Sequence, residues 1–323
     1  MRTTNLGPIE NVSRITLGGG GLGAIWGPSA DEAVATVHTA IDGGVTLIDT
    51  APSYRDCEAV IGQAFDGALP AHMRITTKCQ LGAVPPAEVA PRLEASLTAS
   101  LAAMKLPRAD IFFLHSNICE DDYVYARGQS RRDRFATPWS LYVGEVVPAL
   151  EALKASGRIG AWGITGIGVP ATIREALGHA PAPDVVQAIA NLLDSAGGIR
   201  GFAEPEQPRA IIAAAKRGID VMGIRAVQAG ALTAAIDREL PPENRDAQDY
   251  RRAAPFRALC DELGENPAVL AHRYALSMDG VDTVVIGVKN RAELADCLEA
   301  EGQGPLPPEL TRRIDALGLR DAE

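Results

Sequence analysis

Short strand patterns alternate with helical patterns along this 323-residue chain. Eight short apolar segments read as buried strands, and a helical pattern follows most of them. The eight segments are Ile15–Leu17, Val45–Asp49, Arg74–Cys79, Asp110–Leu114, Gly160–Ile164, Asp184–Ile189, Asp220–Ile224 and Thr283–Ile286. Repeated strand–helix units form a parallel sheet with right-handed crossovers, and eight of them close into a barrel. The expected fold is therefore α/β, a (β/α)8 TIM barrel.

One domain over residues 1–323 is the expected organisation, because the chain shows no internal repeat and no low-complexity linker. Barrels of this kind often run past about 250 residues as a single unit. Two stretches read as irregular: a charged insert over about residues 117–138, after the fourth strand, and a long loop over residues 228–251, after the seventh. Ser29 and Glu32 form a possible capping box for a helix that runs to about Asp42.

Charge and composition narrow the functional classes. The chain is 46% hydrophobic and 22% charged, which is typical of a soluble globular protein, and its net charge is −10. An acidic surface is a poor partner for nucleic acid, whose phosphates need clustered Lys and Arg. No apolar run approaches the ~20 residues that span a bilayer, and the N-terminus lacks the apolar core of a secretory signal. We expect neither a nucleic-acid partner nor a membrane partner.

The cysteine pattern bears on the cellular compartment. Five cysteines are widely scattered, odd in number and without a CxxC pair: Cys57, Cys79, Cys119, Cys260 and Cys297. This pattern indicates reduced thiols rather than a disulfide framework or a zinc site. It favours a cytoplasmic location.

Four ionisable side chains follow consecutive strands of the expected barrel. Asp49 ends the second strand, Tyr54 lies in the next loop, Lys78 lies near the end of the third strand, and His115 follows the fourth. In barrels of this type, catalytic groups lie at the C-terminal ends of the strands. A single such residue is usually a solvated loop residue; Lys78 alone reads as a strand-edge lysine, and His115 alone as a satisfied core histidine. Four complementary groups at consecutive strand ends indicate a catalytic site.

These four groups suit the protonation of an alkoxide. A phenol, with an ordinary pKa of about 10, is a poor acid at neutral pH, and a neighbouring ammonium lowers its pKa. Asp49 is expected to hold Lys78 charged and in place, and His115 to donate a hydrogen bond to a carbonyl oxygen. No side chain supplies hydride, so the chemistry requires a nicotinamide.

The motifs that carry these residues resemble those of the aldo-keto reductase family. The tetrad motifs read DTAPSY, ITTK and FLHS, and the resemblance runs over nearly the whole chain through LGPIENVSRITLGGGGLG, GRIGAWGIT, DVVQAIANLL, QAGALT and VVIGVKNRAEL. The resemblance implies an eight-fold barrel that binds NADP(H) across its top and reduces carbonyls with an Asp, Tyr, Lys and His tetrad. The tetrad falls on Asp49, Tyr54, Lys78 and His115.

The resemblance also implies cofactor-binding positions around Asp49. Gln187 matches the glutamine that binds the nicotinamide carboxamide. Thr165 keeps the hydroxyl of the family's Ser-Asn pair, whose amide is lost at Gly166. Ile224 takes the place of a tyrosine that stacks on the nicotinamide, so the aromatic contribution is missing. Its neighbour Arg225 either reaches the pyrophosphate or lies in water.

Glycines and cations complete the expected dinucleotide site. Gly19 and Gly20 let the backbone approach the cofactor or simply form a flexible turn. In the last strand–helix turn, Gly287, Lys289 and Arg291 face a 2′-phosphate at a helix N-terminus, which is a natural anion site. This chain departs from the family at two positions there. Glu293 stands where a basic residue is common, and Cys297 stands where the family usually has Asn. Asp296 matches the acid that meets the adenine amino group. NADP is therefore expected over NAD.

The substrate is expected to be a small carbonyl compound. Its pocket is assigned to Tyr54, His115, Trp26 and Trp139, with further aromatic residues in the insert after the fourth strand. These rings either cover a substrate with apolar or sugar-like faces or merely pack the loop onto the barrel. Loops at this end of a barrel shape substrate choice. The sequence does not predict the oligomeric state.

The leading hypothesis is an NADP-dependent reductase of aldehydes or ketones, reversible toward alcohol oxidation. One alternative oxidises a sugar at its anomeric hydroxyl. Another is a non-enzymatic nucleotide sensor like the potassium-channel β subunits that share this fold. A metal-dependent barrel hydrolase is disfavoured, and no metal site is expected, because the remaining histidines fall in expected helices or at strand starts: His38, His72, His179 and His272.

Overall fold

Eight parallel strands close into a barrel in the computed structural model, which describes residues 1–23, 29–125, 129–199 and 207–320. The strands follow the chain around the barrel: β3 (Ile15–Gly18), β4 (Leu47–Asp49), β5 (Arg74–Cys79), β6 (Ala109–Leu114), β9 (Ile159–Thr165), β10 (Val185–Ile189), β11 (Asp220–Ile224) and β12 (Thr283–Gly287). β12 pairs in parallel with β3 and closes the ring. The TIM-barrel prediction is confirmed, and every predicted strand agrees with an observed one to within two residues at each end.

Alternation along each strand fills the inside of the barrel with apolar side chains. One buried cluster contains the inward-facing residues Leu47, Ile111, Phe113, Ala161, Val185 and Met222, with Val285 packed against it. Residues two positions further along these strands therefore point into the barrel nearer its C-terminal end. This alternation brings side chains from separate strands to one place.

A β-hairpin that the sequence did not reveal closes the N-terminal end of the barrel. β1 (Thr3–Leu6) and β2 (Ile9–Ser13) pair antiparallel, and their side chains Leu6, Ile9 and Val12 join the interior cluster. Backbone and side-chain bonds fix the hairpin to strand starts: Gly7 N donates to Asp220 Oδ2 (2.6 Å), and Ser13 N donates to Thr46 Oγ1 (2.9 Å). The opposite end remains for a functional site.

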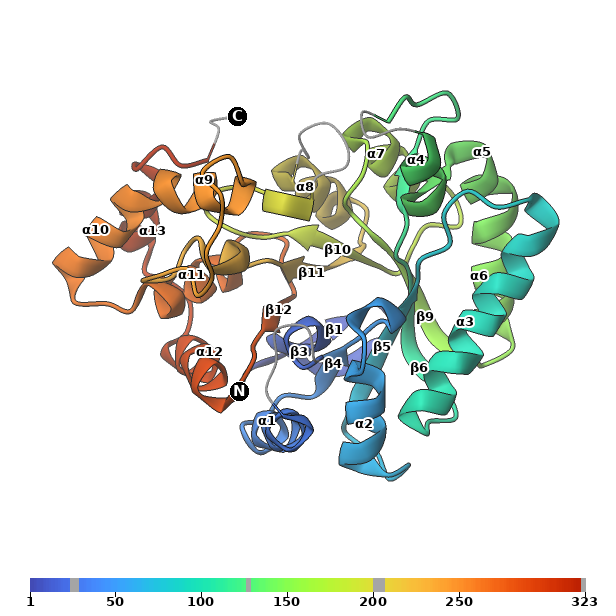
Figure 1. Ribbon diagram of the computed structural model, residues 1–323, viewed down its shortest axis with the longest axis horizontal. Helices are drawn as coiled ribbons and strands as arrows, with labels where there is room; N and C mark the ends of the chain where they lie inside the picture. The colour runs from blue at the N-terminus through green and yellow to red at the C-terminus, as the bar shows by residue number, and fades with distance from the viewer. Residues whose placement is uncertain (24–28, 126–128, 200–206, 321–323) are drawn as a thin grey trace.

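Helices surround the strands in Figure 1. They are α1 (Ala30–Asp42), α2 (Cys57–Phe65), α3 (Val89–Met104), α5 (Trp139–Leu141), α6 (Val147–Ala155), α7 (Pro170–Gly178), α8 (Gln207–Lys216), α10 (Ala254–Leu263), α11 (Pro267–Leu276), α12 (Arg291–Gln303) and α13 (Pro308–Asp315). Short helical turns are η1 (Gly19–Gly21), η2 (Pro52–Tyr54), η3 (Pro86–Glu88), the π-helical η4 (Tyr142–Val146), η5 (Gly197–Ile199) and η6 (Gln228–Gly230). Half of the expected capping box is present: the Ser29 side chain accepts a hydrogen bond from Glu32 N at the start of α1, but the Glu32 carboxylate binds Arg291 and not the backbone of Ser29.

Both stretches expected to be irregular contain regular structure. The insert after β6 holds β7 (Asn117–Cys119) and β8 (Ala136–Pro138), which pair in parallel, and the helix α4 (Gln129–Phe135). The stretch after β11 ends in α9 (Arg245–Arg252), whose side chains are mostly polar and carry no apolar periodicity to read. In Figure 1, α9, α10, α11 and α13 gather at one side of the barrel. A second buried cluster, which includes Phe256 and Tyr274, packs these helices together.

Within the described ranges, no helix combines the length and the apolar character needed to cross a membrane. The expectation of one domain over residues 1–323 stays a prediction. Contacts between distant parts of the chain agree with it: Arg2 binds Glu301 of α12 through its backbone N (2.7 Å) and its Nε (3.0 Å).

Close packing around β9 generates a test of the barrel. A Cβ added at Gly163 would lie 2.3 Å from Phe113 Cε1 and 2.5 Å from the carbonyl oxygen of Val185. Gly163→Ala is therefore expected to lower the free energy of unfolding by about 1–3 kcal/mol through overpacking. Denaturant titration measures the change. Gly144→Ala is the matched control, because a methyl group there meets open space, and equal stability of the two variants would contradict the packing.

Candidate active site

The structure brings the four predicted catalytic residues together at the C-terminal end of the barrel. Asp49 is the last residue of β4, Lys78 lies in β5, and His115 follows β6 directly. Strand alternation places Asp49 and His115 two positions beyond the inward-facing Leu47 and Phe113. Tyr54 reaches the same place from η2. The site is therefore assembled by adjacent strands, as the order of the motifs predicted.

Lys78 is the centre of the site. Its side chain is fully buried, and its Nζ donates to Asp49 Oδ2 (2.7 Å), to the carbonyl oxygen of Thr50 (2.9 Å) and to Tyr54 OH (3.3 Å). An ammonium has three donors, so these contacts satisfy all of them. A buried charge is tolerated only where a counter-charge and hydrogen bonds compensate for its lost hydration, and Lys78 has both.

Asp49 is held as firmly as Lys78. Its Oδ1 accepts hydrogen bonds from Thr76 Oγ1 (2.5 Å) and from Gln187 Nε2 (2.7 Å), and its Oδ2 accepts from Lys78. Gln187 belongs to β10, so this bond crosses the barrel. The sequence did not single out Thr76, although its position two residues before Lys78 on the same strand was a usable signal.

Burial dominates the acidity of Tyr54. It raises the pKa of the phenol, and the positive charge of Lys78 opposes this rise without cancelling it. The expectation that the ammonium brings the pKa of Tyr54 below its ordinary value is wrong for the protein alone, because desolvation of the phenolate is the larger effect. For Lys78 the balance is the reverse: burial lowers its pKa, but the charge of Asp49 and the hydrogen bonds to Asp49 and Tyr54 outweigh burial and raise it. Lys78 is therefore an ammonium beside a neutral phenol at neutral pH.

His115 is a neutral imidazole. Burial, with a smaller contribution from the charge of Lys78, lowers the pKa of His115 from 6.5 to about 3. Its ring meets the Tyr54 ring edge to face, with centroids 5.8 Å apart and an interplanar angle of 89°. A neutral imidazole keeps one N–H, so His115 can donate a hydrogen bond close to the phenol.

The rim around the tetrad has room for a ligand at two of the glycines assigned to a dinucleotide. A Cβ added at Gly20 or at Gly287 meets no atom within 4 Å. Gly19 differs, because a Cβ there would lie 2.3 Å from Cys57 Sγ. The absence of a side chain at Gly19 therefore makes room for the side chain of Cys57 and not for a ligand.

The other predicted cofactor positions lie around the same rim. Thr165 ends β9, and its hydroxyl donates to the carbonyl oxygen of Leu114 (3.2 Å). Ile224 ends β11 and packs against a small apolar cluster that includes Ile167 and Ile189. A hydroxyl, the Gln187 amide and an aliphatic surface beside open glycines fit a nicotinamide dinucleotide. The individual assignments stay predictions.

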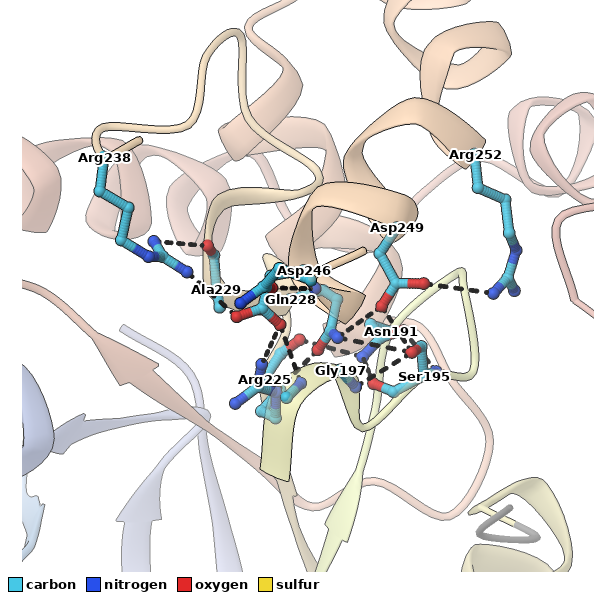
Figure 2. Close-up of polar contacts among 12 residues, drawn as sticks. Asn191, Ser195, Gly197, Arg225, Gln228, Ala229, Arg238, Asp246, Asp249 and Arg252 are labelled. Atoms are coloured by element: carbon cyan, nitrogen blue, oxygen red, sulfur yellow. Dashed lines mark hydrogen bonds and ion pairs between the residues drawn. The ribbon is translucent and has the colours of Figure 1, made fainter. Parts of the chain in front are cut away.

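Arg225 lies in a polar network that the sequence did not predict (Figure 2). Its Nε donates to Gln228 Oε1 (2.7 Å), and its Nη2 pairs with Asp246 Oδ1 (3.3 Å). Gln228 in turn donates to Asp249 Oδ2 (2.7 Å), which also accepts from Ser195 Oγ (2.6 Å). The partners come from η6, α9 and the loop after β10. Because these segments are far apart in sequence, the sequence did not predict the network. Arg225 is thus a paired, half-buried residue and not a solvated loop arginine.

Strained backbone accompanies this network. Arg225 (φ 60°), Gln228 (φ 44°) and Ala229 (φ 50°) adopt left-handed conformations, and Gly230 (φ 90°) follows them. Non-glycine residues in this region carry a conformational cost that surrounding contacts must offset. The hydrogen bonds and ion pair of Arg225 and Gln228 provide such contacts for the turn after β11.

The two cations assigned to a 2′-phosphate are ion-paired. Lys289 Nζ pairs with Asp237 and with Glu293 Oε1 (2.9 Å), and Arg291 Nη2 pairs with Glu32 Oε2 (2.9 Å). Asp296 lies on α12, one turn beyond Glu293. Glu32, Asp237 and Glu293 were not predicted as partners of the cations. Glu32 and Asp237 lie far away in the sequence, but the four-residue spacing of Lys289 and Glu293 was a usable signal.

The expected substrate residues are only partly described. Trp26 lies outside the described residues. Trp139 packs against Tyr142 (ring centroids 5.6 Å apart) and against His179 (5.9 Å), which supports its interpretation as a packing residue. A cavity of about 310 Å³ opens beside His115, and Ser53, Gln80, Arg92 and Ser96 contribute its polar lining. Within the described residues, no three His, Cys, Asp or Glu side chains are grouped to hold a metal ion.

Comparisons with known proteins agree with this geometry. A family model described as "Aldo/keto reductase family" matches residues 14–318. L-Galactose dehydrogenase from Arabidopsis thaliana is 26% identical to the chain over 296 residues, which cover 90% of this chain and 84% of the relative.

Two solved structures share the fold. A glycerol dehydrogenase from Gluconobacter oxydans superposes with a TM-score of 0.71 at 21% identity, over 98% of this chain and 94% of that one. The holo form of an aldo-keto reductase from Bacillus halodurans also gives a TM-score of 0.71, at 19% identity, over 98% of this chain and 96% of that one. At these identities, the similarity of the structures establishes the barrel.

Removal of the counter-charge of Lys78 tests the buried ion pair. Asp49→Asn is expected to lower the free energy of unfolding by about 3–5 kcal/mol, because it leaves a buried ammonium without a partner. Denaturant titration at neutral pH measures the loss. Asp66→Asn removes an exposed partner of Lys105 and is the control, for which only a small change is expected. A similar small change in both variants would argue against the buried pair.

The lowered pKa of His115 predicts a pH dependence of stability. Its pKa is about 3 in the folded protein and returns to its ordinary value, about 6.5, in the unfolded chain. Between these values the unfolded state binds a proton that the folded state does not. The free energy of unfolding should therefore fall as the pH is lowered from about 6.5 toward 3.

His115→Gln isolates this contribution, because it removes the titrating group and leaves the other ionisable groups in place. Its free energy of unfolding, measured across the same pH range, should fall less steeply than that of the unsubstituted protein. Parallel curves would show that His115 titrates normally.

Proposed function

Because the chain belongs to the aldo/keto reductase family, we propose that it interconverts a carbonyl group and an alcohol with a nicotinamide dinucleotide, and that Tyr54 is its proton donor and acceptor. One observation carries the proposal: a fully buried ammonium, Lys78, contacts both the Asp49 carboxylate and the Tyr54 hydroxyl. A lysine buried among apolar strands without a chemical role is a costly feature. The arrangement suits a phenol that loses and regains a proton.

The residues of the chain have separate tasks in this reaction. The nicotinamide supplies or accepts the hydride when it is bound. The N–H of His115 and the hydroxyl of Tyr54 hold the carbonyl oxygen, and Tyr54 gives its proton to that oxygen as negative charge develops there. Lys78 stabilises the phenolate that remains, and Asp49 keeps Lys78 in position. Alcohol oxidation uses the same contacts in the opposite direction.

The raised pKa of Tyr54 fits this role. A phenol that stays protonated until an alkoxide forms next to it transfers its proton only to the reacting oxygen. Lys78 lies 4.7 Å from the centroid of the Tyr54 ring as well as near its hydroxyl, so the positive charge is already in place when the phenolate appears. This pre-organisation lowers the cost of the charge that develops in the transition state.

NADP(H) is the dinucleotide we propose. Gln187, Thr165, Ile224 and the open glycines at the rim would hold the nicotinamide end. Lys289 and Arg291, beside the N-terminus of α12, would meet the 2′-phosphate. The cytoplasm is the proposed location, because all five cysteines are free and buried and suit a reducing compartment.

A sugar dehydrogenase is the second candidate. His115 also lines a cavity that carries hydroxyl, amide and guanidinium groups from Ser53, Gln80, Ser96 and Arg92. These groups suit a hydroxylated ligand, but Tyr54 is not among the lining residues. A relative named L-galactose dehydrogenase supports the same substrate class. Oxidation of an anomeric hydroxyl runs the proton transfer in reverse, from that hydroxyl to the Tyr54 phenolate that Lys78 stabilises. A non-enzymatic nucleotide sensor is less favoured, because such a protein has no use for the complete tetrad.

Tyr54→Phe tests the proton-transfer role. Turnover of a good substrate, either an aldehyde with NADPH or a sugar with NADP, should fall by about 10²- to 10⁴-fold, because the general acid is lost. The ring and its packing remain, so dinucleotide affinity measured by calorimetry should stay similar. An active Tyr54→Phe variant would mean that another group supplies the proton.

A further inference from the structure

The two cations beside the N-terminus of α12, Lys289 and Arg291, are already ion-paired with carboxylates of the chain. Glu32 Oε2 lies 2.9 Å from Arg291 Nη2, and Glu32 Oε1 accepts from Arg291 Nε (3.1 Å). The two side chains thus form a bidentate pair, which is the strong geometry for a guanidinium. Hydrogen bonding to Arg291 lowers the pKa of Glu32, so Glu32 stays charged at neutral pH. Arg291 therefore already holds an anion.

Lys289 is enclosed by two carboxylates. Its Nζ pairs with Glu293 Oε1 (2.9 Å) and with Asp237. Asp237 is itself paired with Arg238, whose other bonds reach Asp246 Oδ2 (3.1 Å) and the carbonyl oxygen of Ala229 (3.1 Å), as Figure 2 shows. Lys289 is thus tied to the network around Arg225.

Backbone donors at this turn are taken by the same side chains. Lys289 N donates to Glu293 Oε2 (2.9 Å), and Arg291 N donates to Glu32 Oε1 (3.2 Å). A phosphate at a helix N-terminus uses such N–H groups together with nearby cations. Glu32 and Glu293 therefore bind both the backbone N–H groups and the cationic side chains that a phosphate at this helix N-terminus would need.

We propose that Glu32 and Glu293 are internal counter-ions that compete with a 2′-phosphate for Arg291 and Lys289, and so limit the preference of the chain for NADP(H) over NAD(H). This inference rests on the proposed function, because it concerns the same dinucleotide site. A dinucleotide with the 2′-phosphate must displace the ion pairs that Glu32 and Glu293 form, while Asp237 remains a further partner of Lys289. A dinucleotide without the 2′-phosphate leaves all three pairs intact. The preference for NADP(H) over NAD(H) is then smaller than it would be if Lys289 and Arg291 had no carboxylate partners.

Binding of small adenosine phosphates isolates this effect from the redox reaction. Adenosine 2′,5′-bisphosphate carries the 2′-phosphate, and AMP lacks it. Calorimetry with the full chain gives the affinity ratio of the two. Glu32→Gln and Glu293→Gln each remove a charge and keep an acceptor oxygen. Each should raise the affinity for the bisphosphate about two- to fivefold, and the double variant roughly tenfold, with AMP affinity unchanged.

Two control variants separate ion pairing from a general change in charge. Asp31→Asn removes a charge next to Glu32 from an exposed residue that is a partner of neither cation. Glu262→Gln breaks a remote pair of the same length, 2.9 Å to Arg313 Nη2. Both should leave the affinity ratio unchanged. Thermal unfolding of every variant confirms the fold, and each single variant is an independent test.

The outcomes are distinct. A ratio that rises in the two glutamine variants and not in the controls supports the competition. A ratio that is the same in all variants, or that rises equally in Asp31→Asn, overturns it while the proposed function stands. Failure of the unsubstituted protein to bind either NADPH or NADH overturns the proposed function and this inference together.

Discussion

The buried ion pair between Lys78 and Asp49 is the constraint on which the site depends. An ammonium with no exposed surface needs a counter-charge at hydrogen-bond distance, and the carboxylate needs donors for its second oxygen. Asp49 receives these from Thr76 and Gln187, so the pair joins β4, β5 and β10. These bonds leave Lys78 with one donor for Tyr54. The ion pair with Asp49 therefore stabilises the buried charge of Lys78 and also positions its ammonium next to the Tyr54 hydroxyl.

The barrel was predictable because its signal is local and repeated. Each strand is short and apolar, and eight such patterns leave few alternatives. The N-terminal hairpin escaped prediction because residues 3–13 mix polar and apolar side chains, and their apolar members are buried only by the barrel floor. α9 escaped for a similar reason, since its exposed face is charged and Asp249, one of its two buried residues, is itself polar. Tertiary contacts decide both elements.

Parts of the site were predictable to different degrees. Asp49, Tyr54, Lys78 and His115 follow strands in order, so the parallel arrangement alone brings them to one end of the barrel. The sign of the pKa shift of Tyr54 was not predictable, because it depends on how far burial outweighs one positive charge. Most partners of Arg225, Lys289 and Arg291 were not predictable either. Asp246, Asp237 and Glu32 come from α9, from the loop before it and from α1, at large separations in sequence. Glu293 is the exception, because it lies four residues after Lys289.

Two kinds of ion pair at the same end of the barrel illustrate how burial decides the role of a charge. Lys78 has no exposed side-chain surface, and its pair with Asp49 is fixed, because separation would strand a charge in a medium of low polarity. Arg291 is more than half exposed at 56%, and water can replace Glu32 at little cost. A fixed charge suits a reaction that needs the same geometry at every turnover. An exchangeable pair suits a surface where a ligand must compete for the cation.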